Sequence, residues 1–190
     1  SASVAGANQA LCNTSVFTLG ATVPVVGAGQ WSYVSGAAVT ITNTNSATTT
    51  VTGLTAGSSV TLRWTVSNGP VCAALTSDVT LTNDVLPVAD AGTGGNVCGI
   101  GVANSFVLSG SPTVGTGTWT KFSGPGAETF TNANLSTSSV SVDAYGSYVF
   151  RWTEVNGTCS SFDDVTVVFW EAPSASVAGA NQALCNTSVF

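Results

Sequence analysis

Two stretches of the chain place an apolar side chain at every second position. Residues 60–66 read VTLRWTV, and residues 148–153 read YVFRWT. A period of two is typical of a β-strand with one buried face and one wetter face. An Asn-Gly pair follows each stretch, at 68–69 and at 156–157, and such pairs favour turns. Each stretch therefore predicts a strand that ends at a tight turn.

These patterns recur at a fixed distance along the chain. PVVGAGQW at 24–31 returns as PTVGTGTW at 112–119, and SVTLRWTVSNGPVC at 59–72 returns as SYVFRWTEVNGTC at 147–159. The shift is about 88 residues, which is long enough for several short strands separated by turn signals. The pattern predicts two copies of a β-sandwich that is immunoglobulin-like in the broad sense.

A longer repeat is identical in every residue. The first seventeen residues, SASVAGANQALCNTSVF, return unchanged at 174–190. Such a repeat indicates a tandem array whose period is a pair of divergent modules. We therefore expect one sandwich at 1–87, a second at 88–173, and the start of a third at 174–190. The partner strands of that third module would come from a continuation of the polypeptide, or the tail would add to another chain by strand donation.

The composition supports an all-β fold and narrows the function. Charged residues make up 6% of the chain, against roughly 25% in ordinary globular proteins, and β-branched Val and Thr dominate. The net charge of −6, with three basic residues, argues against nucleic acid or an anionic membrane as a partner. No apolar run approaches the roughly 20 residues of a membrane span, so we expect no membrane insertion.

The chain also lacks the residues of the common catalytic sites. It contains no histidine, which excludes Ser-His-Asp and Cys-His nucleophilic sites. Asp163 and Asp164 are the one adjacent acidic pair, but neighbours on a strand point to opposite faces of the sheet. We therefore expect a protein that is not an enzyme.

Each expected module carries two cysteines at matched positions. They are Cys12 and Cys72 in the first module, and Cys98 and Cys159 in the second. Pairing within a module predicts one intradomain disulfide in each sandwich, enclosing about 60 residues and worth about 4 kcal/mol by the loop-entropy model. Cys185 would then pair with a partner outside the chain. The alternative is that all five are reduced core thiols, whereas a metal site is disfavoured because no C-x-x-C spacing is present.

Two further residue sets are candidates for structural roles. Four tryptophans fall at matched repeat positions, which predicts core side chains and not a sugar-binding platform: Trp31, Trp64, Trp119 and Trp152. Three acidic residues cluster near the expected module junctions: Asp84, Asp90 and Glu171. Their oxygens are candidate ligands for Ca²⁺, and the alternative is that they are surface acids. Apart from this calcium, we expect no cofactor.

The blocks A-D-A-G, P-x-V-G-x-G-x-W, F-R-W-T, N-G-x-C and D-D-V-T-V run from residue 89 to 167, and in weaker form from 4 to 81. This combination resembles the PKD-like, immunoglobulin-fold repeats of large secreted proteins of the Bacteroidota. The resemblance implies an extracellular β-sandwich exported by the type IX secretion route. Such repeats form stalks of giant adhesins, gliding-motility surface proteins and modular enzymes. The resemblance transfers no binding site, because the shared motif residues are core and turn positions.

Repeat, composition and resemblance together predict a structural unit of a long extracellular adhesin or filament, built as a disulfide-stapled stalk at the cell surface. Its expected partners are neighbouring modules of the same chain, with surface glycans or other cells as further candidates. The alternative is a glycan- or protein-binding module of a modular secreted protein.

Overall fold

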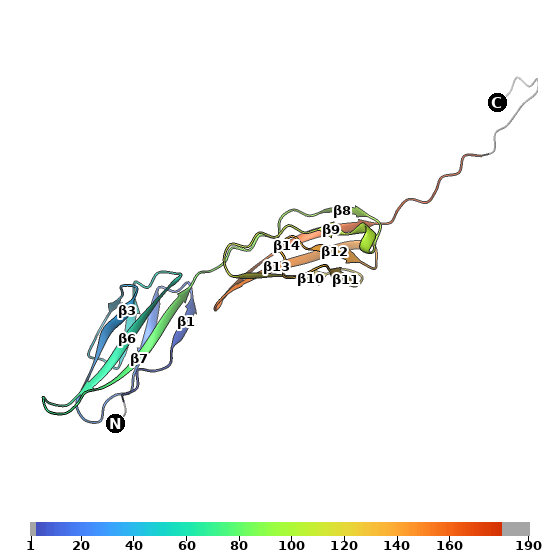
Figure 1. The fold of residues 1–190 in the computed structure, drawn as a ribbon. Coiled ribbons are helices and arrows are strands. Elements are labelled where there is room, and N and C mark those ends of the chain that lie inside the picture. Colours follow the sequence, from blue (N-terminus) through green and yellow to red (C-terminus); the bar gives the residue numbers. More distant parts are fainter. Residues whose placement is uncertain (1–2, 180–190) are drawn as a thin grey trace, which may run out of the picture.

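The computed structural model describes residues 3–179, which form two β-sandwiches joined end to end (Figure 1). The first sandwich contains β1 (Gln9–Cys12), β2 (Val16–Gly20), β3 (Ala28–Gly36), β4 (Thr40–Ile41), β5 (Thr48–Thr52), β6 (Ser58–Ser67) and β7 (Leu75–Asp84). One sheet has the strand order β1-β7-β6-β3, and the facing sheet has the order β2-β5-β4. Most neighbours are antiparallel, but β1 runs parallel to the C-terminal part of β7.

The second sandwich repeats this topology. It contains β8 (Gly95–Cys98), a short 3-10 helix (Val102–Asn104), β9 (Phe106–Val107), β10 (Thr116–Ser123), β11 (Glu128–Phe130), β12 (Ser139–Val142), β13 (Gly146–Asn156) and β14 (Cys159–Trp170). The sheets have the orders β8-β14-β13-β10 and β9-β12-β11. The first strand is again parallel to the last one, because β8 pairs with the end of β14. Within the described residues, no helix is long or apolar enough to cross a membrane.

The alternating strands bury their apolar faces as the sequence pattern requires. Two separate core clusters form, one from residues between Ala5 and Leu81 and the other from residues between Ala91 and Phe169. The four tryptophans lie in these cores with exposed fractions of 1–2%. Trp31 on β3 lies opposite Trp64 on β6 with ring centroids 5.0 Å apart, and Trp119 lies opposite Trp152 at 5.1 Å. Both pairs are tilted, a geometry that aromatic rings favour over a face-to-face sandwich.

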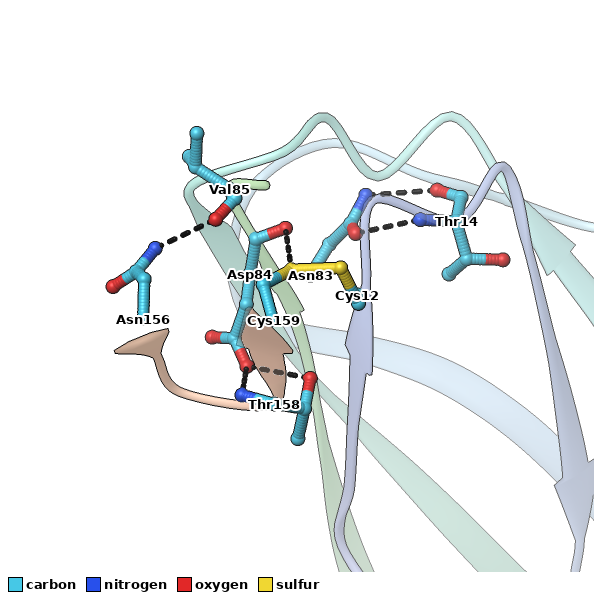
Figure 2. The surroundings of a disulfide bond; sticks show 8 residues. All are labelled: Cys12, Thr14, Asn83, Asp84, Val85, Asn156, Thr158 and Cys159. Carbon is cyan, nitrogen blue, oxygen red and sulfur yellow. Dashed lines mark hydrogen bonds between the residues drawn. A yellow bond between two sulfur atoms is a disulfide. The ribbon is translucent and has the colours of Figure 1, made fainter. Parts of the chain in front are cut away.

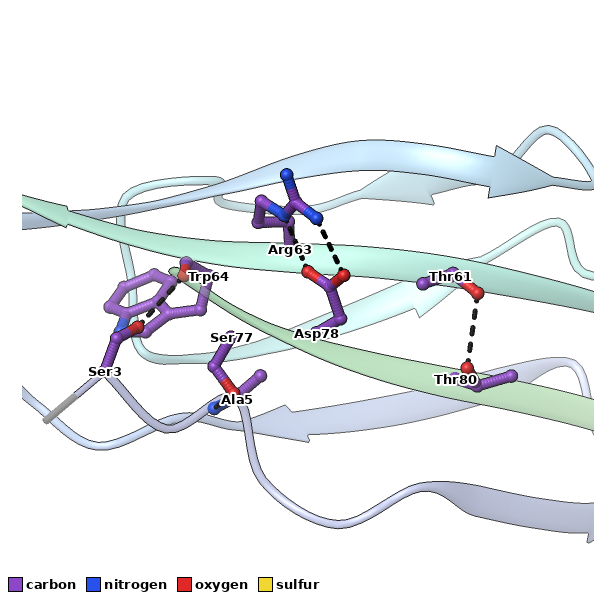
Figure 3. A network of polar contacts seen from close by, with 8 residues as sticks. All are labelled: Ser3, Ala5, Thr61, Arg63, Trp64, Ser77, Asp78 and Thr80. Atoms are coloured by element: carbon purple, nitrogen blue, oxygen red, sulfur yellow. Dashed lines mark hydrogen bonds and ion pairs between the residues drawn. The ribbon is translucent and has the colours of Figure 1, made fainter. Parts of the chain in front are cut away.

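The outward face of the large sheet carries polar cross-strand pairs. Figure 3 shows Arg63 on β6 donating two hydrogen bonds to Asp78 on β7, at 2.7 and 2.8 Å. The hydroxyls of Thr61 and Thr80 lie 3.2 Å apart on the same face. The second sandwich repeats the ion pair between Arg151 and Asp164.

The chain leaves the second sandwich at the end opposite the first one (Figure 1). Residues 174–179 are exposed and contain no strand. They correspond to the first six residues of the chain, which precede β1. The sequence copy of β1, and Cys185 with its expected partner outside the chain, lie outside the described residues.

Candidate functional site: the joint between the sandwiches

The joint between the two sandwiches combines side-chain hydrogen bonds with a disulfide. Figure 2 shows the turn between β13 and β14 reaching back to the end of the first sandwich, where β1 and β7 both end. Asn156 closes β13 and donates from Nδ2 to the carbonyl of Val85, at 2.9 Å. The hydrogen bond ties the tip of one sandwich to the linker that leaves the other.

Asp84, the last residue of β7, binds this turn through its carboxylate. Oδ2 accepts hydrogen bonds from the backbone N–H of Thr158 at 2.7 Å and from its hydroxyl at 2.9 Å. Gly157 precedes Thr158 with φ +57°, and a Cβ there would lie 2.2 Å from Oδ2 of Asp84. The turn therefore needs glycine both for its left-handed backbone and for the close approach of the carboxylate.

A disulfide between Cys12 and Cys159 completes the joint (Figure 2). Their Cα atoms lie 4.9 Å apart although the residues are 147 positions apart in sequence. Asn83 holds the chain just after Cys12: its Oδ1 accepts from the N–H of Thr14 at 3.0 Å, and its Nδ2 donates to the carbonyl of Thr14 at 2.8 Å. Asn83 is buried, so this side chain fixes the position of the strand end that carries Cys12.

The expectation of one disulfide inside each sandwich was therefore wrong. Because β1 is parallel to β7, Cys12 lies beside Asp84 at the linker end of β7. Cys72 lies in the turn before β7, at the opposite end of that ten-residue strand, so about 30 Å of strand separates the two positions. A disulfide needs Cα atoms within about 7 Å. The same argument separates Cys98 from Cys159 in the second sandwich.

Cys72 and Cys98 are consequently exposed and unpaired in the described part of the chain. Neither is a core thiol, so the alternative of five buried reduced cysteines does not hold for these two. The sequence did contain a sign that the two modules use their second cysteines differently. The turn NGTC of the second module becomes NGPVC in the first, which replaces the Thr158 donor by Pro-Val.

The three candidate calcium ligands do not come together. Asp84 is engaged with Thr158, and Oδ1 of Asp90 accepts a hydrogen bond from the N–H of Gly92 at 2.8 Å. Glu171 is exposed. Within residues 3–179, no group of three His, Cys, Asp or Glu side chains is arranged to hold a metal ion.

The adjacent carboxylates of the second module serve the fold. Asp163 accepts a hydrogen bond from the N–H of Ala91 at 2.9 Å, and Asp164 pairs with Arg151 on the opposite face of the sheet. The hydrogen bonds from Arg151 lower the pKa of Asp164 below its ordinary value, and desolvation of the carboxylate opposes this shift. The guanidinium also lies between two exposed rings, 4.2 Å from the centroid of Phe122 and 3.8 Å from that of Phe162.

Comparison with known proteins supports the fold. No family model matches the chain, and no curated protein matches it in sequence. Among solved structures it is similar to extracellular domains 3–5 of Drosophila OTK, with TM-score 0.57 and 12% identity over 86% of this chain and 59% of that chain. Immunoglobulin domains 1–5 of Sidekick-1 match with TM-score 0.55 and 15% identity, over 88% of this chain and 38% of that one. A three-domain immunoglobulin segment of titin matches with TM-score 0.50 and 14% identity, over 88% and 64%.

The chain thus spans less than two thirds of each of these structures. At such low identity the similarity shows the fold alone, which is a tandem of immunoglobulin-like β-sandwiches.

Proposed function

We propose that the chain is a structural unit of a long extracellular stalk or filament, in which sandwiches join end to end and disulfides fasten the joints. The observation that carries this proposal is the Cys12–Cys159 bond, because it connects two sandwiches and not two strands of one sandwich. A covalent link at that place adds little to a binding surface. It fixes how one module follows the next, which is what a stalk requires.

An extracellular location is part of the proposal. Disulfides persist in oxidising compartments and are rare in the cytosol. Similarity to the extracellular segment of OTK is compatible with this location. Together with the resemblance to PKD-like repeats, the proposal favours a surface adhesin of the Bacteroidota type, exported by the type IX route, with no enzymatic activity of its own.

The strand arrangement suits a protein that bears tension along its length. Tension enters the first sandwich through the segment before β1 and leaves it through β7, and these two strands are parallel neighbours. When the two strands are pulled in opposite directions, all the hydrogen bonds between them bear the force at the same time. They do not break one after another. The bond from Cys12 to Cys159 then passes part of the load directly to the second sandwich.

Imaging the native material tests this function. The longest strand, β14, has twelve residues, so each sandwich adds about 40 Å and the two-module unit about 80 Å. We expect thin fibres with an axial repeat near that length. A glycan or protein array that detects tight binding, lost when Phe122 and Phe162 are replaced by Ala, would instead support the ligand-binding module.

A further inference from the structure

The two unpaired cysteines occupy the same places in their sandwiches as the two paired ones. Cys98 ends β8 opposite Trp170, just as Cys12 ends β1 opposite Asp84. The next residue makes the same backbone hydrogen bond in both modules, from Gly99 N–H to Trp170 O and from Asn13 N–H to Asp84 O, each at 2.9 Å. Cys98 therefore presents its thiol at the far end of the second sandwich as Cys12 does at the joint.

Cys72 corresponds to Cys159 in the same way. Each follows an Asn-Gly pair in the turn that connects the two longest strands of the large sheet. In the first sandwich this turn lies at the end farthest from the second sandwich (Figure 1). The chain thus carries one exposed thiol at each outer end, one equivalent to each half of the disulfide in the joint.

The side chains beside Cys98 and those beside Cys72 are similar in character, because both sets are apolar. The place of Asp84 is taken by Trp170, which is 58% exposed and donates from Nε1 to Oδ1 of Asn96 at 2.8 Å. The place of Thr158 is taken by Pro70-Val71, where Val71 is 92% exposed and the proline has no N–H to donate. A polar pair, Asp84 with Thr158, therefore fills the joint, while both outer ends carry apolar groups.

We propose that Cys98 of one two-module unit forms a disulfide with Cys72 of a further copy of the same unit, with Trp170 packing on Pro70 and Val71 at this second type of joint. The proposal rests on the proposed stalk function and extends it, since every joint of the array then carries one disulfide. The two thiols lose two protons and two electrons as the S–S bond forms. A disulfide oxidant, such as oxidised glutathione or a protein disulfide, takes them up and becomes two thiols.

The two joint chemistries also keep the modules in alternating order. If two first modules followed each other, the Asp84 carboxylate would face Pro70, which has neither the N–H nor the hydroxyl that Thr158 donates. The carboxylate would then lose the two hydrogen bonds that it accepts from Thr158 in the observed joint. If two second modules followed each other, Trp170 would face the polar turn of Thr158. Each end therefore selects its proper neighbour.

A disulfide map of a tandem tests the proposal. The tandem consists of residues 1–173 followed by residues 1–190, with the last cysteine, Cys185 of the second unit, replaced by Ser. Cleavage after Lys and Arg and before Asp places Cys12, Cys72, Cys98 and Cys159 on four different fragments. In a glutathione buffer we expect the Cys12–Cys159 fragment pair and a Cys98–Cys72 fragment pair. Cys98→Ser in the first unit removes the second pair and leaves the first.

Separate chains provide the second arm, because the further copy can be on the same polypeptide or on another one. Within the tandem, the linker gives an effective concentration in the millimolar range, so the Cys98–Cys72 bond forms independently of protein concentration. Between separate 190-residue chains carrying Cys185→Ser, its formation rises with concentration and produces a ladder of multimers on non-reducing gels.

The matched variants probe the apolar contact. Trp170→Ala should lower the yield of the Cys98–Cys72 pair several-fold at fixed glutathione ratio. Phe162→Ala, which removes a ring of similar exposure near the joint end of the same strand β14, should not. A tandem in which Cys12–Cys159 forms while Cys72 and Cys98 remain fully alkylatable would overturn this inference and leave the stalk function standing. Loss of the Cys12–Cys159 pair as well would overturn both.

Discussion

The two central tryptophans occupy the same place in the two sandwiches but meet different partners. Trp152 donates from Nε1 to Oε1 of Glu154 at 3.2 Å. In the first sandwich Val66 stands where Glu154 would be, and the indole N–H of Trp64 has no hydrogen-bond partner among the described residues. Glu154 is completely buried and also accepts from Thr113, whose backbone N–H lies 3.1 Å from Oε2 and whose hydroxyl lies 3.0 Å from it. One carboxylate thus satisfies three donors in the second sandwich, whereas the matching indole of the first sandwich has no acceptor among the described residues.

Replacing this carboxylate by an apolar side chain should destabilise the second sandwich. In Glu154→Val, the buried indole of Trp152 and both donors of the exposed Thr113 lose their acceptor. The indole N–H stays buried without a partner, which costs about 1–3 kcal/mol. Urea unfolding followed by tryptophan fluorescence measures the change. Glu154→Gln keeps one acceptor oxygen and should lose less. Equal stability of Glu154→Val and the parent chain would show that water reaches these donors.

The two arginine–aspartate pairs predict a small dependence of stability on acid pH. Hydrogen bonds from Arg63 and Arg151 lower the pKa values of Asp78 and Asp164 in the folded state. A lowered folded pKa adds stability above the unfolded value of about 4, and this stability is lost as the pH falls through the folded pKa. Both pairs are partly exposed, so solvent screening keeps the contribution small.

The double variant Asp78→Asn, Asp164→Asn should therefore flatten the loss of stability below about pH 4. Urea midpoints measured across that range give the slope. Glu171→Gln is the control, because Glu171 is exposed and no pair with an arginine involves it in the described structure. A parent chain and a double variant with the same slope would contradict the role of the pairs.

At the scale of strands, the sequence predicted which faces are buried but not which strands are neighbours. The alternation at 60–66 and 148–153 correctly marks β6 and β13 and the burial of their tryptophans. A period of two specifies a face and contains no information on the direction of the strand beside it. The short strands β1 and β8 are mostly polar or exposed, so nothing in their pattern indicated parallel pairing with β7 and β14. The positions of Cys12 and Cys98 depend on that pairing.

Strand β10 requires glycine at position 117, because the ring of Trp152 on the neighbouring strand β13 lies directly against the backbone there. A Cβ at Gly117 would lie 1.8 Å from Cζ2 of Trp152, and a Cβ at Gly29 on β3 would lie 2.0 Å from Cζ2 of Trp64. Gly117→Ala should therefore cost at least about 1–3 kcal/mol, the usual penalty of an overpacked core. Thermal unfolding measures it. Gly20→Ala is the control, since a Cβ there has no heavy atom within 4 Å, and a Gly117→Ala chain as stable as that control would show that Trp152 moves freely.

At the scale of the whole molecule, the repeat indicated which segments are equivalent but left the disulfide pairing ambiguous. Each module has two cysteines at matched positions. The same cysteines can form disulfides within modules or between modules, so their positions in the sequence do not decide the pairing. What decides is the geometry of the ends: β1 brings Cys12 to the linker, and the long hairpin of β13 and β14 brings Cys159 across it. The contacts of Asp84 with Thr158 depend on the same geometry.

The Cys12–Cys159 disulfide should stabilise the first sandwich about as much as a disulfide within that sandwich would. When the first sandwich unfolds alone, its chain stays attached to the folded second sandwich twice, through Cys12 and through the linker after Asp84. This closes a loop of about 70 residues, which the loop-entropy model values at about 4 kcal/mol. Cys159→Ser, in a chain that also carries Cys72→Ser and Cys98→Ser, should therefore lower the protection of β6 amides in the first sandwich against hydrogen exchange. The chain with only Cys72→Ser and Cys98→Ser is the control. Unchanged protection of β6 in the Cys159→Ser chain would contradict a stabilising disulfide at the joint.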